Sequence, residues 1–439
     1  MQSEIFERLK KDKIKFISLQ FSDLFGVVKE IVTPATKLED IIENGLWFDG
    51  SSIEGFARIH ESDLFLKPDL STYSVIPWIK EGEKTACFIC DVYSHEGKPF
   101  ERDARYILKK IISELRKENL EYNVGPEIEF YIFRETNKNK PVPMDYGSYF
   151  DLTSHEGYKF IREVITSLRN FEINVETSHH EVGGGQYEID FEYGPALKIA
   201  DRVLRLKYTI KKIAQMHELQ ATFMPKPIMD APGSGMHVHQ SLIDAETGKN
   251  LFYDGKDKYK LSKIAYSFIA GQMKYIKEMC AILSPTVNSY KRLVSGFEAP
   301  CYITWGSMNR SSLIRVPKWL KEKSARIELR CPDSSCNPYL AFAVMAKSGF
   351  EGIRNNLTPP PPVEENVYKM EEGLINEKNI EMLPTSLWEA LEEMKSSKIV
   401  YETLGKSLFG KYIEIKTREW NEYKRQVTSW EIEKYMGLY

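Results

Sequence analysis

The stretch GPEIEFYIF, residues 125–133, places Glu127 and Glu129 inside an otherwise apolar run. The run predicts a strand, in which alternate side chains point to the same side of a sheet. Both carboxylates therefore share one face, and Ile128 and Phe130 share the other. Two interpretations of this segment are open. The glutamates face water on a half-exposed strand, or they lie in a site where a positive group compensates them, because burying unpaired carboxylates is costly.

The same alternation recurs in three more segments that predict strands: HHEVGGGQYEIDF (179–191), GSGMHVHQ (233–240) and ARIELR (325–330). In each of them, charged or imidazole groups share one face and apolar groups share the other. Ordinary surface strands would also carry Lys, Thr, Ser and Gln, whereas Glu, His and Arg dominate here. If these strands are neighbours, their polar faces form one surface. The residues concerned are Glu181, Glu188, His237, His239, Arg326, Glu328 and Arg330.

Five glutamates and one histidine on a single surface would repel one another without a cation. Oxygen-rich ligands with one imidazole match Mg²⁺ or Mn²⁺ better than zinc, for which cysteine or several histidines are expected. Six ligands exceed what one Mg²⁺ ion usually takes from a protein, so we expect two ions in each site. The predicted ligands are Glu127, Glu129, Glu181, Glu188, His237 and Glu328.

Several arginines follow close together in the sequence. Paired metal ions together with arginines are typical of sites that catalyse phosphoryl transfer. A guanidinium group binds phosphate or carboxylate through two parallel hydrogen bonds. The alternative is that these groups pair with surface acids, and for Lys323 taken alone we prefer this alternative. For Arg292, Arg310 and Arg330 the neighbouring motifs favour a functional role. This part of the sequence supplies Arg292, Glu298, Arg310, Arg315, Lys323, Arg326 and Arg330.

Length, charge and cysteine content restrict the class of protein. A chain of 439 residues is too long for one ordinary core, so two or three domains are expected. A net charge of −3 without an extended basic run gives no support for nucleic-acid binding. No segment approaches the roughly 20 apolar residues of a membrane span, and no signal peptide is evident, so we expect a cytoplasmic protein without a membrane partner. Cys87 and Cys90 would face opposite sides of a strand, which argues against a zinc half-site.

The order of predicted elements suggests two domains with a boundary near residue 100. The first hundred residues read as short strands at 15–21, 27–32, 75–79 and 85–93 with one helix near 36–44. A polar stretch follows, and Asp103 then caps a predicted helix. Beyond it, helices are predicted at 157–170, 196–219, 262–283 and 337–353, and strands at 124–133, 173–181, 186–192, 221–226, 235–242 and 325–331.

The motifs FDGSSIEGF, GPEIEF, HHEVGGGQYEIDF, GSGMHVHQSL, KRLVSGFEAP, NRSSLIRVP and RIELRCPDSSCNPYL occur in this order. Together they resemble glutamine synthetase of the bacterial and archaeal type I class, in its shorter, non-adenylylated subtype. The resemblance implies an α+β fold, with an N-terminal β-grasp domain at 1–102 and a C-terminal catalytic α/β domain at 103–439. It further implies a curved antiparallel sheet lined by metal ligands. It also implies a dodecamer of two hexameric rings with active sites between neighbouring subunits.

The resemblance also assigns roles to individual residues. It implies that Glu129, Glu181 and Glu188 hold a first Mg²⁺ or Mn²⁺ ion, and that Glu127, His237 and Glu328 hold a second. The residues implied to bind glutamate and its acyl phosphate are Gly233, Arg292 and Arg330, with Arg310 facing the transferred phosphoryl group. Those implied to contact ATP are His239, Ser241, Arg315, Lys323 and Arg326. Asp49 and Ser52 are implied to bind ammonium at the neighbouring subunit's site, and Glu298 to close a flap.

The function implied by the resemblance is ATP-dependent ligation of ammonia to L-glutamate, which assimilates nitrogen. The products are glutamine, ADP and phosphate, and γ-glutamyl phosphate is the intermediate. Two alternatives stay open: a ligase that joins glutamate to another amine, and an inactive structural or regulatory relative. The chain departs from the family pattern at Pro232, before GSGMH, while Arg58 matches either a feedback-associated arginine or an ordinary surface ion pair. A regulatory protein partner is also compatible with the sequence.

Overall fold

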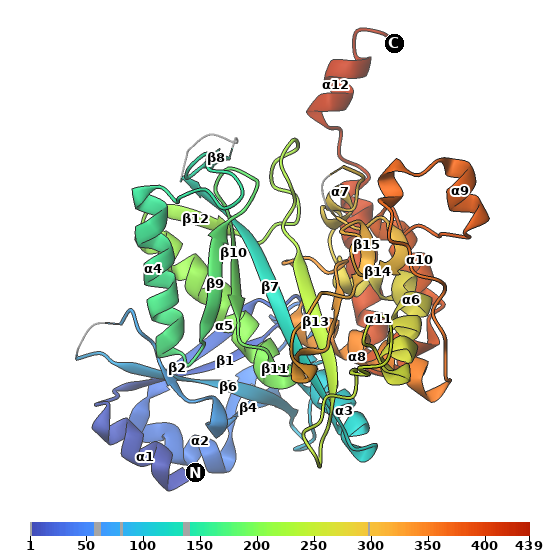
Figure 1. Ribbon diagram of the computed structural model, residues 1–439. Helices are drawn as coiled ribbons and strands as arrows, with labels where there is room; N and C mark the ends of the chain where they lie inside the picture. Colours follow the sequence, from blue (N-terminus) through green and yellow to red (C-terminus); the bar gives the residue numbers. More distant parts are fainter. Residues whose placement is uncertain (1, 57–62, 80–81, 135–140, 297–298) are drawn as a thin grey trace.

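The computed structural model describes residues 2–56, 63–79, 82–134, 141–296 and 299–439, which form an α+β structure with two sheets (Figure 1). The smaller sheet has the order β2-β1-β6-β4-β3, with β5 also paired to β6. Its strands β1 and β6 are parallel, and its other pairs are antiparallel. The elements are α1 (Gln2–Lys11), β1 (Phe16–Ser22), β2 (Val28–Pro34), α2 (Leu38–Asn44), β3 (Leu46–Asp49), β4 (Asp63–Pro68), β5 (Ser74–Val75) and β6 (Thr85–Ser94).

The larger sheet is curved and has the order β14-β15-β16-β13-β7-β10-β9. Strands β8, β11 and β12 also pair with β7, and among the described pairs only β14 and β15 run parallel. Its strands are β7 (Leu120–Arg134), β8 (Val142–Pro143), β9 (Val175–His180), β10 (Gln186–Phe191), β11 (Gly194–Pro195), β12 (Leu219–Thr222), β13 (Met236–Asp244), β14 (Tyr302–Gly306), β15 (Ser312–Arg315) and β16 (Ile327–Leu329).

Several helices of the larger part cover the apolar side of this sheet. Helices α3 and α5 pack on β7, α4 packs on β9, and α6 packs against α8. Figure 1 shows α12 projecting away from the rest of the chain. The helices are α3 (Ala104–Lys117), α4 (His155–Asn170), α5 (Ala196–Met216), α6 (Lys263–Leu283), α7 (Ser289–Arg292), α8 (Pro338–Arg354), α9 (Glu372–Glu377), α10 (Leu387–Lys395), α11 (Lys398–Tyr423) and α12 (Ser429–Tyr435). None of the helices described combines the length and apolar content that a bilayer crossing needs.

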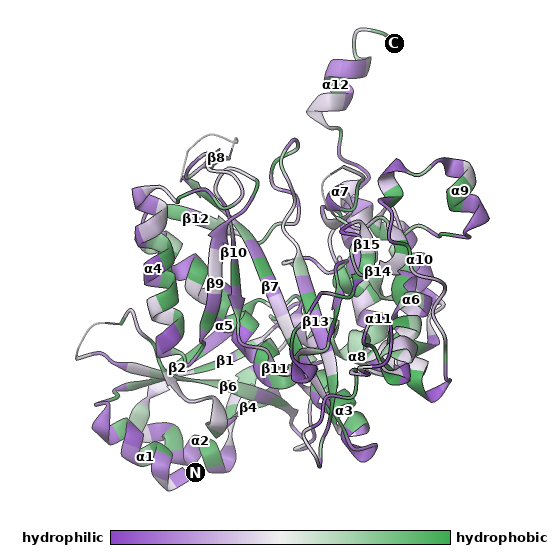
Figure 2. Cartoon of the chain, in the orientation of Figure 1, coloured by the Kyte–Doolittle hydropathy of each residue, from purple (hydrophilic) through white to green (hydrophobic). Residues whose placement is uncertain are grey.

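Strand β7 shows why the opening stretch decides the fold. Ile128, Phe130 and Ile132 are completely buried in the main core, on the side covered by helices. Glu127 and Glu129 lie on the other side of the strand, and Figure 2 shows the resulting mixture of hydrophobic and hydrophilic segments along β7. One strand thus serves both the core and a polar surface.

One buried cation joins the smaller part of the chain to two helices of the larger part, α3 and α5. The Arg105 side chain on α3 is 3% exposed, and its guanidinium nitrogens lie 2.6 Å from Asp91, 2.7 Å from Asp69 and 2.9 Å from Asp201. Asp69 and Asp91 belong to the smaller part of the chain, whereas Asp201 belongs to α5. Because removing one partner of a buried charge network is costly, this network fixes the orientation of the two parts.

Most long elements predicted from the sequence are confirmed. The helices at 157–170, 196–219, 262–283 and 337–353 correspond to α4, α5, α6 and α8, and Asp103 caps α3 by accepting a hydrogen bond from the Arg105 amide. The prediction of a single helix in the first hundred residues is wrong, because α1 precedes β1. The prediction of a strand at 75–79 is also wrong, since β5 ends at Val75.

Candidate active site

The register of the larger sheet brings the predicted polar residues together. On one side of β7, Glu188 of β10 lies opposite Glu129, and Asp190 lies opposite Glu127. On its other side, His237 of β13 also lies opposite Glu127. Because directly opposite side chains emerge on the same face, these groups form one continuous polar surface.

Two more strands extend this surface. Glu328 of β16 lies opposite His239 of β13 and opposite Arg315 of β15. Arg315 Nη2 is 2.5 Å from Glu328 Oε2, and Arg330 Nε is 3.2 Å from Glu328 Oε1. The predicted convergence of the four strand regions is therefore confirmed, and Glu328 is buried between two guanidinium groups.

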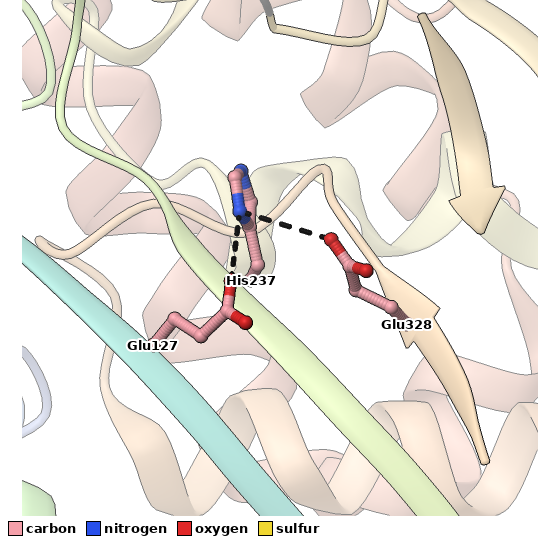
Figure 3. A group of neighbouring side chains, drawn as sticks. All are labelled: Glu127, His237 and Glu328. Atoms are coloured by element: carbon pink, nitrogen blue, oxygen red, sulfur yellow. Dashed lines mark hydrogen bonds and ion pairs between the residues drawn. The ribbon is translucent and has the colours of Figure 1, made fainter. Parts of the chain in front are cut away.

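Three side chains from three strands form a first cluster of possible metal ligands, shown in Figure 3. One ligand atom each from Glu127, His237 and Glu328 lies within 4.8 Å of the others. His237 Nδ1 is 3.3 Å from Glu127 Oε2 and 3.9 Å from Glu328 Oε1. These residues are the set that the family resemblance implies for the second metal ion.

A second cluster comprises His179, Glu181 and Glu188, again with ligand atoms within 4.8 Å of one another. His179 Nε2 is 2.9 Å from Glu181 Oε1 and 3.7 Å from Glu188 Oε1. His179 is not among the ligands predicted from the sequence. Its position two residues before Glu181, at the end of a predicted strand, was the available signal, because that spacing puts both side chains on one face.

Glu129 lies between the two clusters. Its carboxylate accepts hydrogen bonds from the Gly235 amide (2.9 Å) and from Gln186 Nε2 (3.3 Å). Its Oε1 is 4.0 Å from His237 Nε2. Glu129 is thus adjacent both to the first cluster and to Glu188, its neighbour across the sheet.

The electrostatics of this surface fit divalent cations. Burial, followed by the charge of Glu129, raises the pKa of Glu188 to about 11. Burial also raises the pKa of Glu129. Burial opposes ionisation of Glu127, but hydrogen bonds with His237 and His239 hold its pKa below the usual range. Glu188 would ionise only with a cation beside it, whereas Glu127 is already ionised, and both belong to an oxygen-rich set with imidazole that suits Mg²⁺ or Mn²⁺.

Arg292, at the end of α7, is held beside the first cluster. Its guanidinium group donates to the carbonyl oxygens of Cys331 (2.9 Å) and Arg330 (3.2 Å), and its Nη2 lies 3.5 Å from His237 Nε2. A Cβ atom on Gly233 would lie 2.7 Å from Arg292 Cγ. Because nothing larger than glycine fits there, the loop before β13 packs closely on the arginine side chain.

A cavity of about 340 Å³ lies next to Glu127 on this surface. Four of the five residues predicted to contact nucleotide line it: His239, Ser241, Lys323 and Arg326. The fifth, Arg315, instead pairs with Glu328. The cavity lining also includes Asn123, Glu176 and Tyr193, which are not among the residues predicted from the sequence.

Other predicted residues lie elsewhere. Asp49 is exposed at the end of β3, and its carboxylate accepts a hydrogen bond from the Ser51 amide (2.8 Å). Ser52 follows in the next turn, and Arg310 is exposed in the turn between β14 and β15. Glu298 and Arg58 lie outside the described residues.

Both parts of the chain match models of domains from known proteins. The model of the glutamine synthetase β-grasp domain matches residues 13–95, and that of the glutamine synthetase catalytic domain matches 101–435. A glutamine synthetase of Methanocaldococcus jannaschii is 47% identical over 99% of this chain and 97% of that protein. One from Thermotoga maritima is 46% identical over 100% of both chains. A solved structure described as the GmaS/ADP complex has a TM-score of 0.90 at 30% identity, covering 98% of this chain and 99% of that one. The chain therefore belongs to the glutamine synthetase family.

Proposed function

We propose that the polar face of the larger sheet is the site where this chain joins ammonia to L-glutamate. The reaction consumes ATP and yields glutamine, ADP and phosphate through γ-glutamyl phosphate, which is the activity of the family to which the chain belongs. The observation that carries the site assignment is the pair of ligand clusters on neighbouring strands. Use of ATP and a divalent metal ion follows from family membership.

The two clusters are suited to two ions, Mg²⁺ or Mn²⁺. Glu127, His237 and Glu328 would hold one ion, while Glu129, Glu181 and Glu188 would hold the other, with His179 as a neighbour of the second set. When bound, the ions supply positive charge for the glutamate carboxylate and the ATP phosphates. The fixed register of the strands holds these carboxylates in place before substrate arrives, which limits reorganisation during the reaction.

The arginines provide the positive side of the site. Arg292 and Arg330 would bind the glutamate carboxylates and Gly233 would contact the same substrate, while Arg310 would approach the phosphoryl group during transfer. Support for Arg292 comes from its two bonds to backbone carbonyls, which fix its orientation. A guanidinium group already held in position loses little side-chain entropy when an anion binds.

The cavity beside Glu127 is the proposed ATP site. His239, Ser241, Lys323 and Arg326 line it, and Arg326 Nε lies 3.3 Å from His239 Nδ1. Arg315 would act there through Glu328 rather than from the cavity wall. The position of the cavity would bring the ATP phosphates toward the metal-binding carboxylates.

Ammonium is a cation and requires a carboxylate to bind it and a base to deprotonate it. We assign that base to Asp49, assisted by Ser52, and the closing flap to Glu298. The exposed position of Asp49 at an edge strand supports delivery to a neighbouring subunit's site. The corresponding assembly is a dodecamer of two hexameric rings of the type I, non-adenylylated subtype, with the domain boundary near residue 102.

The decisive experiment is measurement of phosphate release from ATP with Mg²⁺ and glutamate, with and without ammonium, while glutamine is followed by mass spectrometry. Phosphate release that depends on ammonium and matches glutamine formation is expected. A competing mixture of small amines should not displace ammonium as the acceptor. Glutamate-dependent phosphate release without glutamine would reject ammonium as the substrate, and retained turnover in Glu129→Gln would reject the metal-site assignment.

A further inference from the structure

The Asp145 carboxylate lies behind the second cluster and accepts hydrogen bonds from three groups of the hairpin formed by β9 and β10. Oδ1 accepts hydrogen bonds from His180 Nε2 (2.7 Å) and from the Gly185 amide (3.1 Å), and Oδ2 accepts one from the Tyr187 hydroxyl (2.5 Å). The Asp145 side chain is 9% exposed, and that of His180 is 1% exposed. The Asp145 carboxylate is therefore largely shielded from solvent, and both of its oxygens accept hydrogen bonds from neighbouring groups.

Two of these partners directly precede the cluster's glutamates in the chain. His180 precedes Glu181 at the end of β9, and Tyr187 precedes Glu188 on β10. His180 also donates from Nδ1 to the backbone carbonyl of Glu181, at 2.6 Å. Because both ring nitrogens face acceptors, the imidazole is fixed at both ends and transmits the position of Asp145 to the backbone of Glu181.

The connecting turn needs such an anchor. Residues 183–185 are three glycines, and Gly185 has a φ of +69°. Glycine leaves the backbone much more conformational freedom than any other residue. The turn nevertheless has to hold the carboxyl groups of Glu181 and Glu188 close together, and these repel each other whenever both are ionised. The Asp145 bond to the Gly185 amide restrains the turn itself, and a Cβ on Gly184 would lie 3.1 Å from the Asp145 carbonyl oxygen.

Asp145 also begins the segment that covers His179. In that segment the Phe150 ring lies 4.7 Å from the His179 imidazole, and the Tyr149 ring lies 5.6 Å from it. His179 in turn contacts Glu181. The same carboxylate therefore joins the glycine turn on one side to the aromatic cover of the cluster on the other.

We propose that Asp145 is a positioning residue for the cation site of Glu181 and Glu188, acting through His180, Tyr187 and the Gly185 amide. This inference rests on the proposed function, since it concerns a cation at that site. Residues that orient metal ligands from behind typically change metal affinity about 10- to 100-fold when they are replaced. Loss of Asp145 should therefore weaken one cation site and leave the Glu127, His237 and Glu328 site unchanged.

The test is Mn²⁺ binding to the full-length protein by electron paramagnetic resonance, without nucleotide or glutamate. Asp145→Asn should weaken one class of Mn²⁺ sites about 10-fold or more and leave the other class unchanged. Tyr187→Phe removes one of the three hydrogen bonds to Asp145 and should lower the Mn²⁺ affinity of the same class of sites to a smaller extent. Asp257→Asn is the matched control, because Asp257 likewise accepts hydrogen bonds from a tyrosine hydroxyl, that of Tyr266 (2.8 Å), and from a backbone amide, that of Tyr259 (2.8 Å), but belongs to neither ligand cluster.

The outcomes separate this inference from the proposed function. A wild-type protein with two classes of Mn²⁺ sites, both unchanged in Asp145→Asn and Tyr187→Phe, would overturn the role of Asp145 alone. A wild-type protein that binds no Mn²⁺ would overturn the proposed metal sites and this inference with them. If Asp145→Asn fails to fold, the result for Tyr187→Phe decides. Unchanged Mn²⁺ affinity of both classes of sites in Tyr187→Phe rejects the proposal, and weaker affinity of one class alone supports it.

Discussion

Glu129 on β7 lies directly opposite Glu188 on β10 in the antiparallel register. Like charges in this arrangement destabilise a sheet. Burial together with Glu129 raises the pKa of Glu188 to about 11, which is the response of a carboxyl group forced into negative surroundings. The sheet therefore accepts an unfavourable pair that a bound cation would convert into a favourable one.

Replacing one member of this pair should reduce the stabilisation of the protein by metal ions. In the presence of a chelator, Glu188→Gln should unfold at the same or a higher temperature than wild type, because the folded variant no longer has to keep a carboxyl group protonated beside Glu129. When Mn²⁺ is well above its dissociation constant, each tenfold increase in Mn²⁺ concentration adds about 1.4 kcal/mol per site to the free energy of unfolding. The wild type with two sites should therefore gain about 2.8 kcal/mol per tenfold increase, and the variant about half of that. Thermal unfolding across an Mn²⁺ titration measures both effects.

The exposed Glu192, two residues after Asp190, provides the control for this experiment. Glu192→Gln removes a carboxylate that accepts a hydrogen bond from Asn174 and belongs to neither ligand cluster, so it should keep the wild-type dependence on Mn²⁺. Equal dependence in wild type and Glu188→Gln would contradict a cation between Glu129 and Glu188.

Arg292 offers a test of glutamate binding. A lysine at this position keeps the charge but cannot bond to both the Cys331 and Arg330 carbonyls while it presents a fork to an anion. Hydrogen bonds to charged groups contribute about 1.5–3 kcal/mol, so Arg292→Lys should raise KM for glutamate about 10- to 100-fold. KM for ATP should change by less than about twofold. Steady-state kinetics with each substrate varied separately gives both values.

Lys291→Arg is the matched control, because it exchanges the same two residue types one position away at an exposed site. It should leave both KM values unchanged. If Arg292→Lys raised the two KM values equally, the arginine would be a support for the loop before β13 rather than a ligand for glutamate.

The polar face could be predicted from the sequence because a strand has a strict period of two. Glu127 with Glu129, and His237 with His239, share faces whatever strands lie beside them. Neighbour relations were less accessible: the pairing of Glu328 with Arg315 depends on the order of β15, β16 and β13. That order is decided by packing across the whole sheet, which no local pattern records.

Elements that lack a local pattern could not be predicted. Helix α1 buries only Ile5 and Leu9, so its apolar stripe is too narrow to be distinctive. Strands β3 and β14 are only four and five residues long, and their sequences, LWFD and YITWG, do not alternate between apolar and polar residues. Asp145 lies between β8 and α4, outside any periodic element, and its significance depends on His180 and Tyr187 meeting it in space.

Gly125 tests the proposed ATP site. It lines the cavity beside Glu127, and a Cβ there would lie 3.0 Å from Tyr193 Cβ and 3.9 Å from His239 Cβ. Gly125→Ala should therefore raise KM for ATP by up to about tenfold, equivalent to about 1.4 kcal/mol, with little change for glutamate. Gly194→Ala is the control, since a Cβ there meets Ile199 at an ordinary 3.8 Å. Isothermal titration with a non-hydrolysable ATP analogue would measure the same loss, and unchanged affinity would place the nucleotide elsewhere.

Asp103 predicts a pH dependence of stability. Its carboxylate accepts hydrogen bonds from the Arg105 amide (3.0 Å) and the Val92 amide (3.3 Å). Burial, followed by the charge of Asp91, raises its pKa to about 7 from an ordinary 3.8. Between these values the folded protein retains a proton that the unfolded chain has released. This group therefore lowers the free energy of unfolding as pH rises, by at most about 1.4 kcal/mol per pH unit.

Asparagine also caps helices well but does not ionise. In Asp103→Asn the free energy of unfolding should therefore depend less on pH between the ordinary pKa of this group and its pKa in the folded protein. Denaturant unfolding of both proteins at pH values from 4 to 8 gives the comparison. The variant should gain stability relative to wild type as pH increases. A difference that stays constant across this range would show that Asp103 is ionised throughout in the folded protein.

Mixed oligomers test whether Asp49 completes a site on a neighbouring subunit. Asp49 lies on the smaller sheet and Glu129 on the larger one, and the Asp49 carboxylate bonds locally to Ser51. Asp49→Asn and Glu129→Gln should each be inactive as pure proteins. Co-expressed with different tags and purified through both, they should recover up to about a quarter of wild-type activity, because each heterologous interface combines two independently chosen subunits. If doubly tagged oligomers of the wild-type size showed no activity above either parent, Asp49 would act within its own subunit or not at all.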